Sequence, residues 1–480
     1  ITAAAERGSD MGLIDWARSL FTHRKSDKVT TPAGTIEKVF GVRPAVSREM
    51  EKGINLWWDL YTGQPSWASC DVRPLGLPRA IGRELARTAL TEFSVAVSGS
   101  QRAEYLNRQM QTAAVRLGEN LEMGLCLGGV CLRPYPDNGR ILVDAFTTRF
   151  SPTRFDGTGK AVGGVFESEP VRQGKEWFVR LEYHDLRNRE DGSTLYVMEN
   201  LAFKSGSGGG IGDQVPLASV EAWAGLAEHT EIENLEGPLF AYFKQPSAND
   251  VDPSSPVGAS VYAGPTVDLI RQADEQWEML RWAYSVAQPK IFAEGTLDPG
   301  QVSDRVFVHG TFTNGNNLFQ IFDPAVKDDA YYRGYQNILR QIESNVGLAF
   351  GIFSDPQSVE KTATEIHASK QRQRVTEKAI QMSLQAALDG LINAMDAWCD
   401  LAQLVPAGDY QTAFNWGDGV LDDPDTRRQD MAMGLSLLNA GIIGPVEYRM
   451  RYFGEDEKTA RKMLPDMEDM TEDDGQNEIE

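Results

Sequence analysis

One long helical pattern constrains the fold of this 480-residue chain more than any other feature. It runs from about residue 362 to 404 and would span roughly 60 Å at 1.5 Å per residue. Its apolar residues recur every three or four positions and form a single stripe: Ile380, Leu384, Leu388, Leu391, Met395 and Trp398. Such a stripe predicts packing in the core or against another subunit, and not a cofactor site.

A helix, a compact strand-rich segment and a second helix precede this long helix. The first helix is expected to open at Gly264-Pro265 and to stop at Gln288-Pro289, because proline suits the first turn and disrupts a helix interior. Glycines and asparagines divide segment 291–322 into short strands. Helical periodicity returns over 324–350, and a short interruption over 351–357 separates it from the long helix.

The rest of the chain adds helices at both ends and strands between them. Helices are predicted over about 47–62, 78–97 and 100–123, with Ser47 capping the first. From about 130 to 204, short alternating segments between turn residues predict an antiparallel sheet, and short helices follow near 425–464. Because no βαβ alternation occurs, we predict the α+β class and exclude doubly wound and barrel folds.

The charge balance excludes a tight nucleic-acid binder. The chain has 47 basic and 69 acidic residues, a formal charge of −22, whereas phosphate neutralisation needs an excess of Lys and Arg. No apolar run approaches the roughly 18 residues that span a bilayer, so we expect a soluble protein with no membrane partner. Segment 11–21 lacks the apolar core of a signal peptide, and four scattered cysteines favour a reducing compartment.

The sequence gives no sign of catalysis. Its five histidines are far apart, and no zinc spacing, phosphate-binding loop or nucleophile elbow is present, so we expect no enzyme, metal or cofactor. Glu176 and Glu182 share the polar face of one strand with Arg180 between them. Six residues at about 3.3 Å place the two carboxylates about 20 Å apart, against about 5–9.5 Å in a glycosidase pair. We therefore predict a solvated face.

The longest helix also carries the densest positive stretch of the chain. Lys370, Arg374 and Lys378 recur at every fourth position, with Arg372 between them and Lys361 just before the helix. Two interpretations remain open. The row is either a solvated face that pairs with acidic neighbours, or a local contact for phosphate or for a partner protein.

Five passages of the sequence resemble the portal proteins of tailed bacteriophages, particularly those of long-tailed phages that infect Gram-positive hosts. They are residues 57–63 (WWDLYTG), 119–134 (ENLEMGLCLGGVCLRP), 150–157 (FSPTRFDG), 240–246 with 255–262 (FAYFKQP and SPVGASVY), and 361–365 (KTATE). Together the passages cover about residues 40–465, and it is their shared order that is specific to the family. None of them is a catalytic signature.

The resemblance implies a portal fold. In chain order, this fold has a mixed α/β wing, two stem helices around a small β-containing clip, a long wing helix and a helical crown. The implied parts are an N-terminal arm (1–40), the wing (41–261, β-rich from about 130 to 204), the first stem helix (262–289), the clip (290–327), the second stem helix (328–350), the tunnel loop (351–361), the long wing helix with a return strand (362–425), the crown (426–465) and an acidic tail (466–480). The tail is expected to be disordered.

The function implied by the resemblance is mechanical. About twelve copies would close into a ring at one vertex of the capsid, in the virion and, during assembly, in the host cytoplasm. Double-stranded DNA would pass through the ring without sequence specificity during packaging and ejection. The implied partners are the terminase large subunit, a head–tail adaptor, the major capsid protein and, where one is present, a scaffold protein.

The resemblance also assigns three groups of candidate site residues. The tunnel loop would present Phe353, Ser354, Asp355, Gln357, Ser358 and Lys361 to the channel. DNA or a neighbouring subunit would contact Lys370, Arg372, Arg374 and Lys378. The adaptor or the terminase would contact the clip residues Lys290, Arg305, His309, Asn314, Asn316 and Asn317.

Two other functions are alternatives. Another capsid-associated protein, such as a minor head or adaptor protein, would lack the helix–clip–helix order before the long helix. A hydrolase built on the β-rich region would need converging carboxylates or a metal cluster, which the sequence does not indicate.

Overall fold

The computed structural model describes residues 31–206, 210–287, 290–293, 307–309, 319–322, 328–356, 363–417, 424–453 and 457–464. Helices make up 45% and strands 22%, which confirms the predicted α+β class. The chain divides into two compact units, Ile1–Trp416 and Gly417–Glu480. The predicted acidic tail and most of the predicted N-terminal arm lie outside the described residues.

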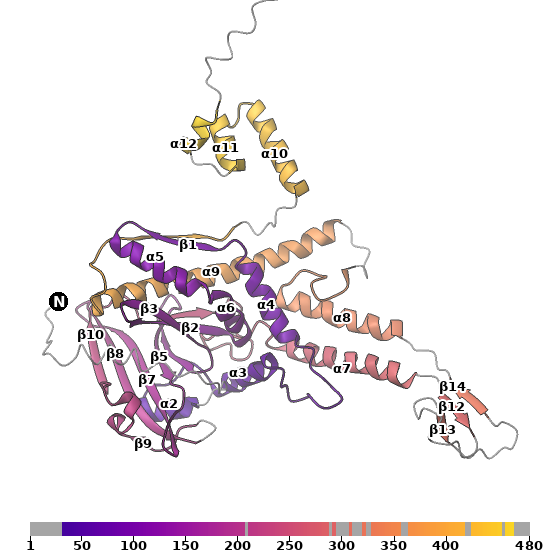
Figure 1. Ribbon diagram of the computed structural model, residues 1–480, viewed down its shortest axis with the longest axis horizontal. Coiled ribbons are helices and arrows are strands. Elements are labelled where there is room, and N and C mark those ends of the chain that lie inside the picture. Colours follow the sequence, from indigo (N-terminus) through magenta and orange to yellow (C-terminus); the bar gives the residue numbers. More distant parts are fainter. Residues whose placement is uncertain are drawn as a thin grey trace, which may run out of the picture. The chain divides into compact units, whose positions relative to one another are not determined.

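Five helices form the first part of the larger unit: α2 (Ala33–Phe40), α3 (Arg48–Tyr61), α4 (Leu77–Ala89), α5 (Gln101–Ala114) and α6 (Leu117–Leu127) (Figure 1). The predicted cap of α3 is confirmed, because the Ser47 side chain accepts a hydrogen bond from Met50 N at 3.3 Å. The single helix predicted over 100–123 is instead two helices, α5 and α6, separated at Val115 and Arg116.

The prediction of one helix over 78–97 is wrong for the second half of that range. α4 ends at Ala89, and residues Ser94–Ser98 form strand β1. β1 pairs antiparallel with β15 (Gln411–Asn415), and Val95 and Val97 are buried while their neighbours in the strand are exposed. Two causes override the helical pattern. β-branched residues alternate along this segment, and its partner strand lies more than 300 positions away in the sequence.

The region from 130 to 204 is antiparallel sheet, as predicted. A seven-stranded sheet follows the order β10-β8-β7-β5-β4, with β6 paired to β7 and β9 to β8. Its strands are β4 (Phe150–Phe155), β5 (Ala161–Glu167), β6 (Val171–Gln173), β7 (Glu176–Asn188), β8 (Thr194–Ser205), β9 (Gln214–Val215) and β10 (His229–Glu233). A second sheet, β11-β2-β3, consists of β2 (Gly129–Asp137), β3 (Arg140–Phe146) and β11 (Ala241–Lys244). Two short 3₁₀ turns, η1 (Leu217–Ser219) and η2 (Glu221–Trp223), lie between β9 and β10.

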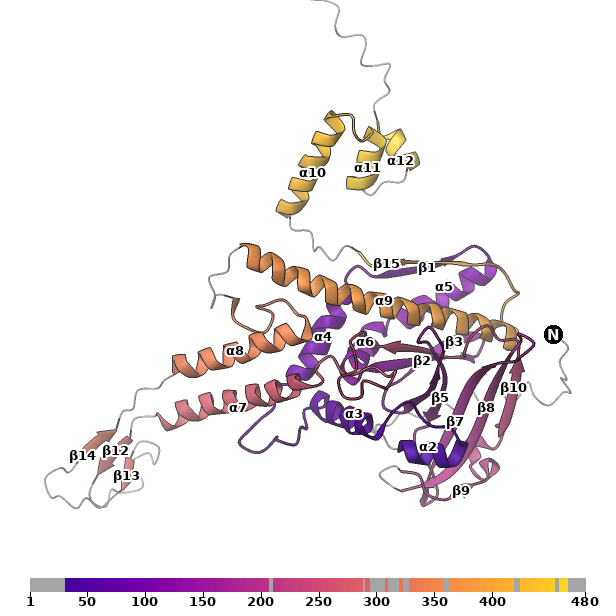
Figure 2. The same ribbon diagram turned by 180° about the vertical axis from the view of Figure 1, so that it is seen from behind.

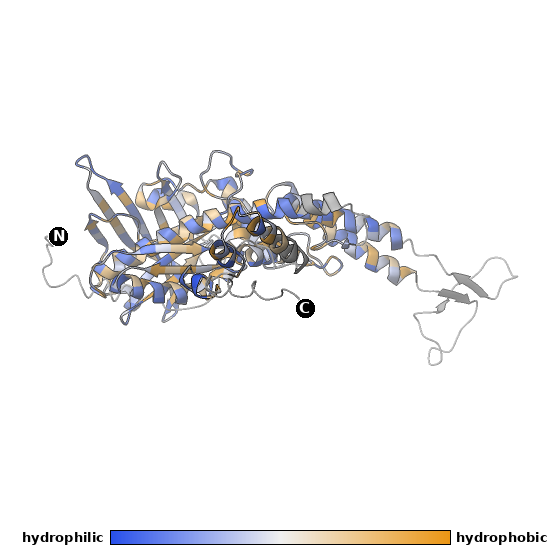
Figure 3. Ribbon diagram, turned by 90° about the horizontal axis from the view of Figure 1, so that it is seen from above, coloured by the Kyte–Doolittle hydropathy of each residue, from blue (hydrophilic) through white to orange (hydrophobic). Residues whose placement is uncertain are grey.

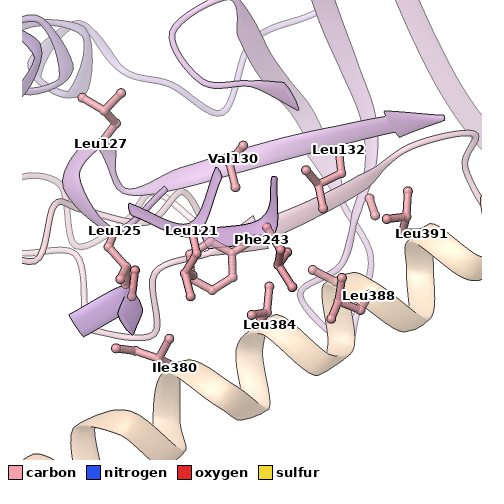
Figure 4. Packing of buried hydrophobic residues seen from close by; sticks show 14 of the residues in the cluster. Leu121, Leu125, Leu127, Val130, Leu132, Phe243, Ile380, Leu384, Leu388 and Leu391 are labelled. Atoms are coloured by element: carbon pink, nitrogen blue, oxygen red, sulfur yellow. The ribbon is translucent and has the colours of Figure 1, made fainter. Parts of the chain in front are cut away.

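The long helix α9 (Ala363–Leu401) provides one side of the main core. Its stripe packs on β11 and β2, where Ile380, Leu384 and Leu388 are at most 1% exposed. Figure 4 shows these residues facing Phe243 and Leu132 across the interface. The stripe predicted from the sequence is therefore a core face.

Helices α7 (Pro265–Val286) and α8 (Asp328–Val346) pack side by side (Figures 1 and 2). Their contacts show an antiparallel pair: Gln276 Nε2 lies 3.4 Å from the Tyr331 carbonyl oxygen, and Asn345 Nδ2 lies 3.5 Å from Thr266 Oγ1. Hydrophilic and hydrophobic residues mix along both helices (Figure 3). Between them in sequence, β12 (Lys290–Ala293) pairs antiparallel with β14 (Phe319–Phe322) and parallel with β13 (Phe307–His309), confirming the predicted strand-rich segment.

The smaller unit contains the predicted short helices. They are α10 (Pro424–Asn439), α11 (Pro445–Phe453) and α12 (Glu457–Lys462). Gly434 on α10 lies under the ring of Tyr452 on α11, where an added Cβ atom would come within 2.3 Å of the ring. Close packing of these two helices therefore depends on glycine at this position.

Candidate functional site

The chain turns sharply where α8 ends. Gly347 has a φ of +76°, in the left-handed region that glycine tolerates best. A Cβ atom at this position would lie 2.2 Å from Thr376 Oγ1 on α9, so the close approach of the two elements also requires glycine. Leu348 follows and is fully buried. The loop that begins here is therefore fixed against α9 from its first residues.

Glu343 of α8 holds this loop through its carboxylate. The side chain is fully buried, and its Oε1 accepts hydrogen bonds from Phe353 N at 2.6 Å and Ser354 N at 2.9 Å. Its Oε2 accepts hydrogen bonds from Gly351 N at 3.2 Å and from the Ser354 hydroxyl at 2.8 Å. Four donors around one carboxylate satisfy a buried charge that would otherwise be costly.

Two glutamines complete the attachment of the loop. Gln336 Oε1 on α8 accepts a hydrogen bond from Asp355 N at 2.6 Å, and Gln373 Oε1 on α9 accepts one from Ala349 N at 3.2 Å. Gln373 in turn donates to Glu377 at 2.8 Å. Side chains from both helices thus set the path of residues 347–356. Sequence analysis missed all three anchoring side chains, because the helical stripe of α8 gives no signal for a buried glutamate.

The residues predicted for the tunnel loop differ in their surroundings. Phe353 and Asp355 are half-buried, whereas the Ser354 side chain is buried and directed at Glu343. Ser354 therefore helps to anchor the loop. Gln357, Ser358 and Lys361 lie outside the described residues.

The predicted basic residues lie together on an exposed face of α9. Lys370, Arg374 and Lys378 are all exposed, and within the described part of the chain none of the three forms an ion pair. Arg372 is also exposed, but it donates to Ser344 Oγ at 3.2 Å and lies 5.5 Å from the centre of the Phe350 ring. Arg372 thus contributes to packing between α9 and the end of α8.

A second basic row shows what a paired, solvated face looks like in this protein. Arg79, Arg83 and Arg87 recur at every fourth position of α4 and are exposed. Arg79 and Arg83 lie 3.4 and 3.8 Å from Glu122, and Arg87 lies 3.7 Å from Glu84. Among the described residues, Lys370, Arg374 and Lys378 form no such ion pair, although Glu377 lies between Arg374 and Lys378 on the same helix.

Only part of the predicted clip is described. Lys290 begins β12 and His309 ends β13, where His309 lies opposite Ala293 in the parallel pair. Arg305, Asn314, Asn316 and Asn317 lie outside the described residues.

The prediction of a solvated face on β7 is wrong for two of its three residues. Glu176 is exposed and lies 2.9 Å from Lys204 Nζ, but Arg180 and Glu182 are each only 2% exposed. β7 is an inner strand that pairs with β5 on one side and β8 on the other. Arg133, from the second sheet, covers this face of β7 and pairs with Glu182. Alternation along one strand could not reveal this second layer.

Glu182 is the centre of a buried network. Its Oε2 accepts hydrogen bonds from Arg133 Nη1 and Arg180 Nη2, both at 3.1 Å, and its Oε1 lies 2.6 Å from His184 Nε2. Burial alone would raise the pKa of Glu182, but the two guanidinium groups and His184 hold that pKa well below its usual value. Glu182 is therefore ionised.

His184 extends the network as a neutral side chain. Burial lowers its pKa, against the opposing effect of Glu182. Its Nδ1 lies 2.7 Å from the Tyr196 hydroxyl, which accepts a hydrogen bond from Leu239 N at 3.2 Å. A tautomer with the proton on Nε2 satisfies both ring nitrogens, because Tyr196 then donates to Nδ1 and Nε2 donates to Glu182.

The described residues contain no group of three or more His, Cys, Asp or Glu side chains that could hold a metal ion. Among the helices of the described part, none is both long and apolar enough to cross a bilayer. No protein-family model and no curated protein matches this sequence.

Proposed function

We propose that this chain is the subunit of a phage portal, a ring at one capsid vertex through which DNA is packaged and ejected. The observation that carries the proposal is the order α7, small sheet, α8, anchored loop and α9. The same order follows from the portal-like passages, of which residues 255–262 precede α7 and residues 361–365 lie at the start of α9. In this proposal α7 and α8 are the stem, β12–β14 belong to the clip, and 351–361 is the tunnel loop.

The anchored loop and the basic row give this proposal a physical mechanism. A conduit must let DNA slide, so a net charge of −22 per subunit suits walls that repel phosphate. A few unpaired cations would then give weak and transient contacts with the backbone. Lys370, Arg374 and Lys378 follow the tunnel loop directly in sequence and are the candidates for these contacts. Glu343 would keep the loop in one conformation while DNA passes.

The surface of α7 supports assembly with other copies. Met279, Trp282 and Val286 are 55, 62 and 38% exposed, and their spacing of three and four residues places these apolar side chains on one face of the helix. A cluster of such side chains on one helix marks an interaction surface. In the proposed ring, the neighbouring subunit covers it. The terminase large subunit and a head–tail adaptor would bind at the clip, and the capsid protein would contact the outer wall.

The mass of the purified assembly tests the proposal. Native mass spectrometry should find a closed ring of about twelve copies of the 53.1 kDa chain. Trp282→Ser should shift the population toward smaller species, because losing a central apolar contact costs about 2 kcal/mol or more. Arg189→Ser, at the exposed turn after β7, is the matched control and should leave the mass unchanged. A monomer at all concentrations would contradict the proposal.

A further inference from the structure

A cavity of about 250 Å³ lies between the two sheets of the larger unit, apart from the loop and the basic row described above. Arg133 of β2, Arg180 of β7 and Phe166 of β5 line it, together with Trp223 of η2. Charged and aromatic side chains therefore meet in one partly open pocket. Aromatic walls with a few fixed polar groups are what a small organic ligand needs, and this pocket offers both beside further charged residues.

The lining includes two guanidinium groups of the buried network. Arg133 and Arg180 share the single carboxylate of Glu182 at 3.1 Å each, while His184 is neutral. Two guanidinium cations thus flank the carboxylate of Glu182 at this end of the cavity. Across the whole lining, however, four arginines are balanced by four carboxylates. A second negative charge on a ligand would therefore meet repulsion.

Arg180 has two donor nitrogens without a hydrogen-bond acceptor in the described part of the chain. Its side chain is 2% exposed, and Nη2 donates to Glu182. Nε and Nη1 are buried and have no acceptor among the residues that the structure describes. Buried guanidinium donors without an acceptor are unfavourable, and a carboxylate is the partner whose geometry suits a guanidinium best. The free donors lie on a residue that lines the cavity.

We propose that this cavity binds a small monocarboxylate that carries an apolar group, with Arg180 as the residue that recognises the carboxylate. One negative charge suits the guanidinium groups of Arg133 and Arg180. Phe166 and Trp223, both buried, provide the apolar wall for the rest of the ligand. A phosphate dianion fits less well, because Glu167 and Glu169 also line the cavity. This site does not depend on the proposed portal function.

Thermal unfolding of the full chain with sodium benzoate, at constant pH and ionic strength, tests the site. The melting temperature should rise saturably with benzoate, and less or not at all with inorganic phosphate or chloride. Arg180→Met should lose the benzoate-dependent rise. Arg172→Met, at an exposed arginine of β6 in the same sheet, is the matched control and should retain it. A rise that is equal in the wild type and in Arg180→Met would overturn the proposal.

Calorimetric titration of the wild-type chain with benzoate keeps the test valid if Arg180→Met fails to fold. We expect saturable binding at one site per chain. Arg180→Lys retains the charge but lacks the fork of donors, so its affinity for benzoate should be at least tenfold lower. No saturable heat with the wild type, or tighter binding of phosphate than of benzoate, would overturn the assignment.

Discussion

Among single residues, Glu182 depends on charged partners for its ionised form. It is buried between Arg133 and Arg180, and its pKa in the folded protein lies below the unfolded value. For a carboxyl group with a lowered pKa, the stabilisation is complete above the unfolded pKa of about 4.3 and is lost as the pH falls toward the folded pKa. The buried network is therefore an acid-sensitive point in the wild-type fold.

Substituting Glu182→Gln should change both the size and the pH dependence of stability. At pH 7 the free energy of unfolding should fall by about 3–5 kcal/mol, because two buried guanidinium groups lose their counter-charge. Between about pH 5 and pH 3, urea unfolding of the variant should show a shallower loss of stability than the wild type. Glu176→Gln, on the same strand but exposed, should keep the wild-type slope. Equal slopes for the wild type and Glu182→Gln would contradict this prediction.

A feature of a single residue can be predicted from the sequence when the groups that cause it are close in the sequence. Ser47 precedes a helix and bonds Met50 N three residues later, so the cap could be read from the sequence. Glu182 and Glu343 could not be predicted as buried, because their partners come from a second sheet and from the loop beyond the helix end. A polar residue in a periodic pattern looks exposed unless its distant partner is known.

At the scale of elements, the loop after α8 depends on one carboxylate. Glu343→Gln should loosen it, because an amide offers one oxygen where four donors now meet a carboxylate. Hydrogen–deuterium exchange at the amides of Gly351, Phe353 and Ser354 should quicken by roughly tenfold or more, equivalent to about 1.4 kcal/mol. Gln341→Ala, exposed on the same helix, should leave these amides protected. Unchanged exchange in Glu343→Gln would show that the loop is held by other contacts.

The basic row on α9 should act in DNA translocation and not in folding. Replacing Lys370, Arg374 and Lys378 by glutamine should lower the amount of DNA packaged by about threefold or more, with ring assembly unchanged. The same replacement of Arg79, Arg83 and Arg87 on α4 removes an equal charge and should leave packaging normal. The measurement is nuclease-protected DNA per assembled particle. Normal packaging by the α9 variant would contradict a role in DNA contact.

The order of elements could be read from the sequence in most of the chain, since α3, α7, α9 and the antiparallel region follow local periodicity and turn residues. β1 shows the limit. Its residues continue a helical pattern from α4, but pairing with β15 fixes them as a strand. The alternation of Val95 and Val97 is a local strand signal, but a five-residue strand is too short to outweigh the helical pattern before it unless its distant partner is known.

For the whole molecule, we propose that many copies form a closed ring around a channel. Four features of the described structure support this proposal. They are the antiparallel α7–α8 pair, the anchored loop, the basic row without ion pairs and the exposed apolar residues on α7. Sequence resemblance connects these pieces to a portal, and the net charge of −22 fits a conduit better than a binder.

Electron microscopy of the purified full chain tests this central claim most directly. We predict particles with rotational symmetry and an open axial channel, in which α7 and α8 form the channel wall and residues 351–361 face its centre. Compact single-copy particles without a central opening, or rings in which the loop after α8 faces outward, would contradict it.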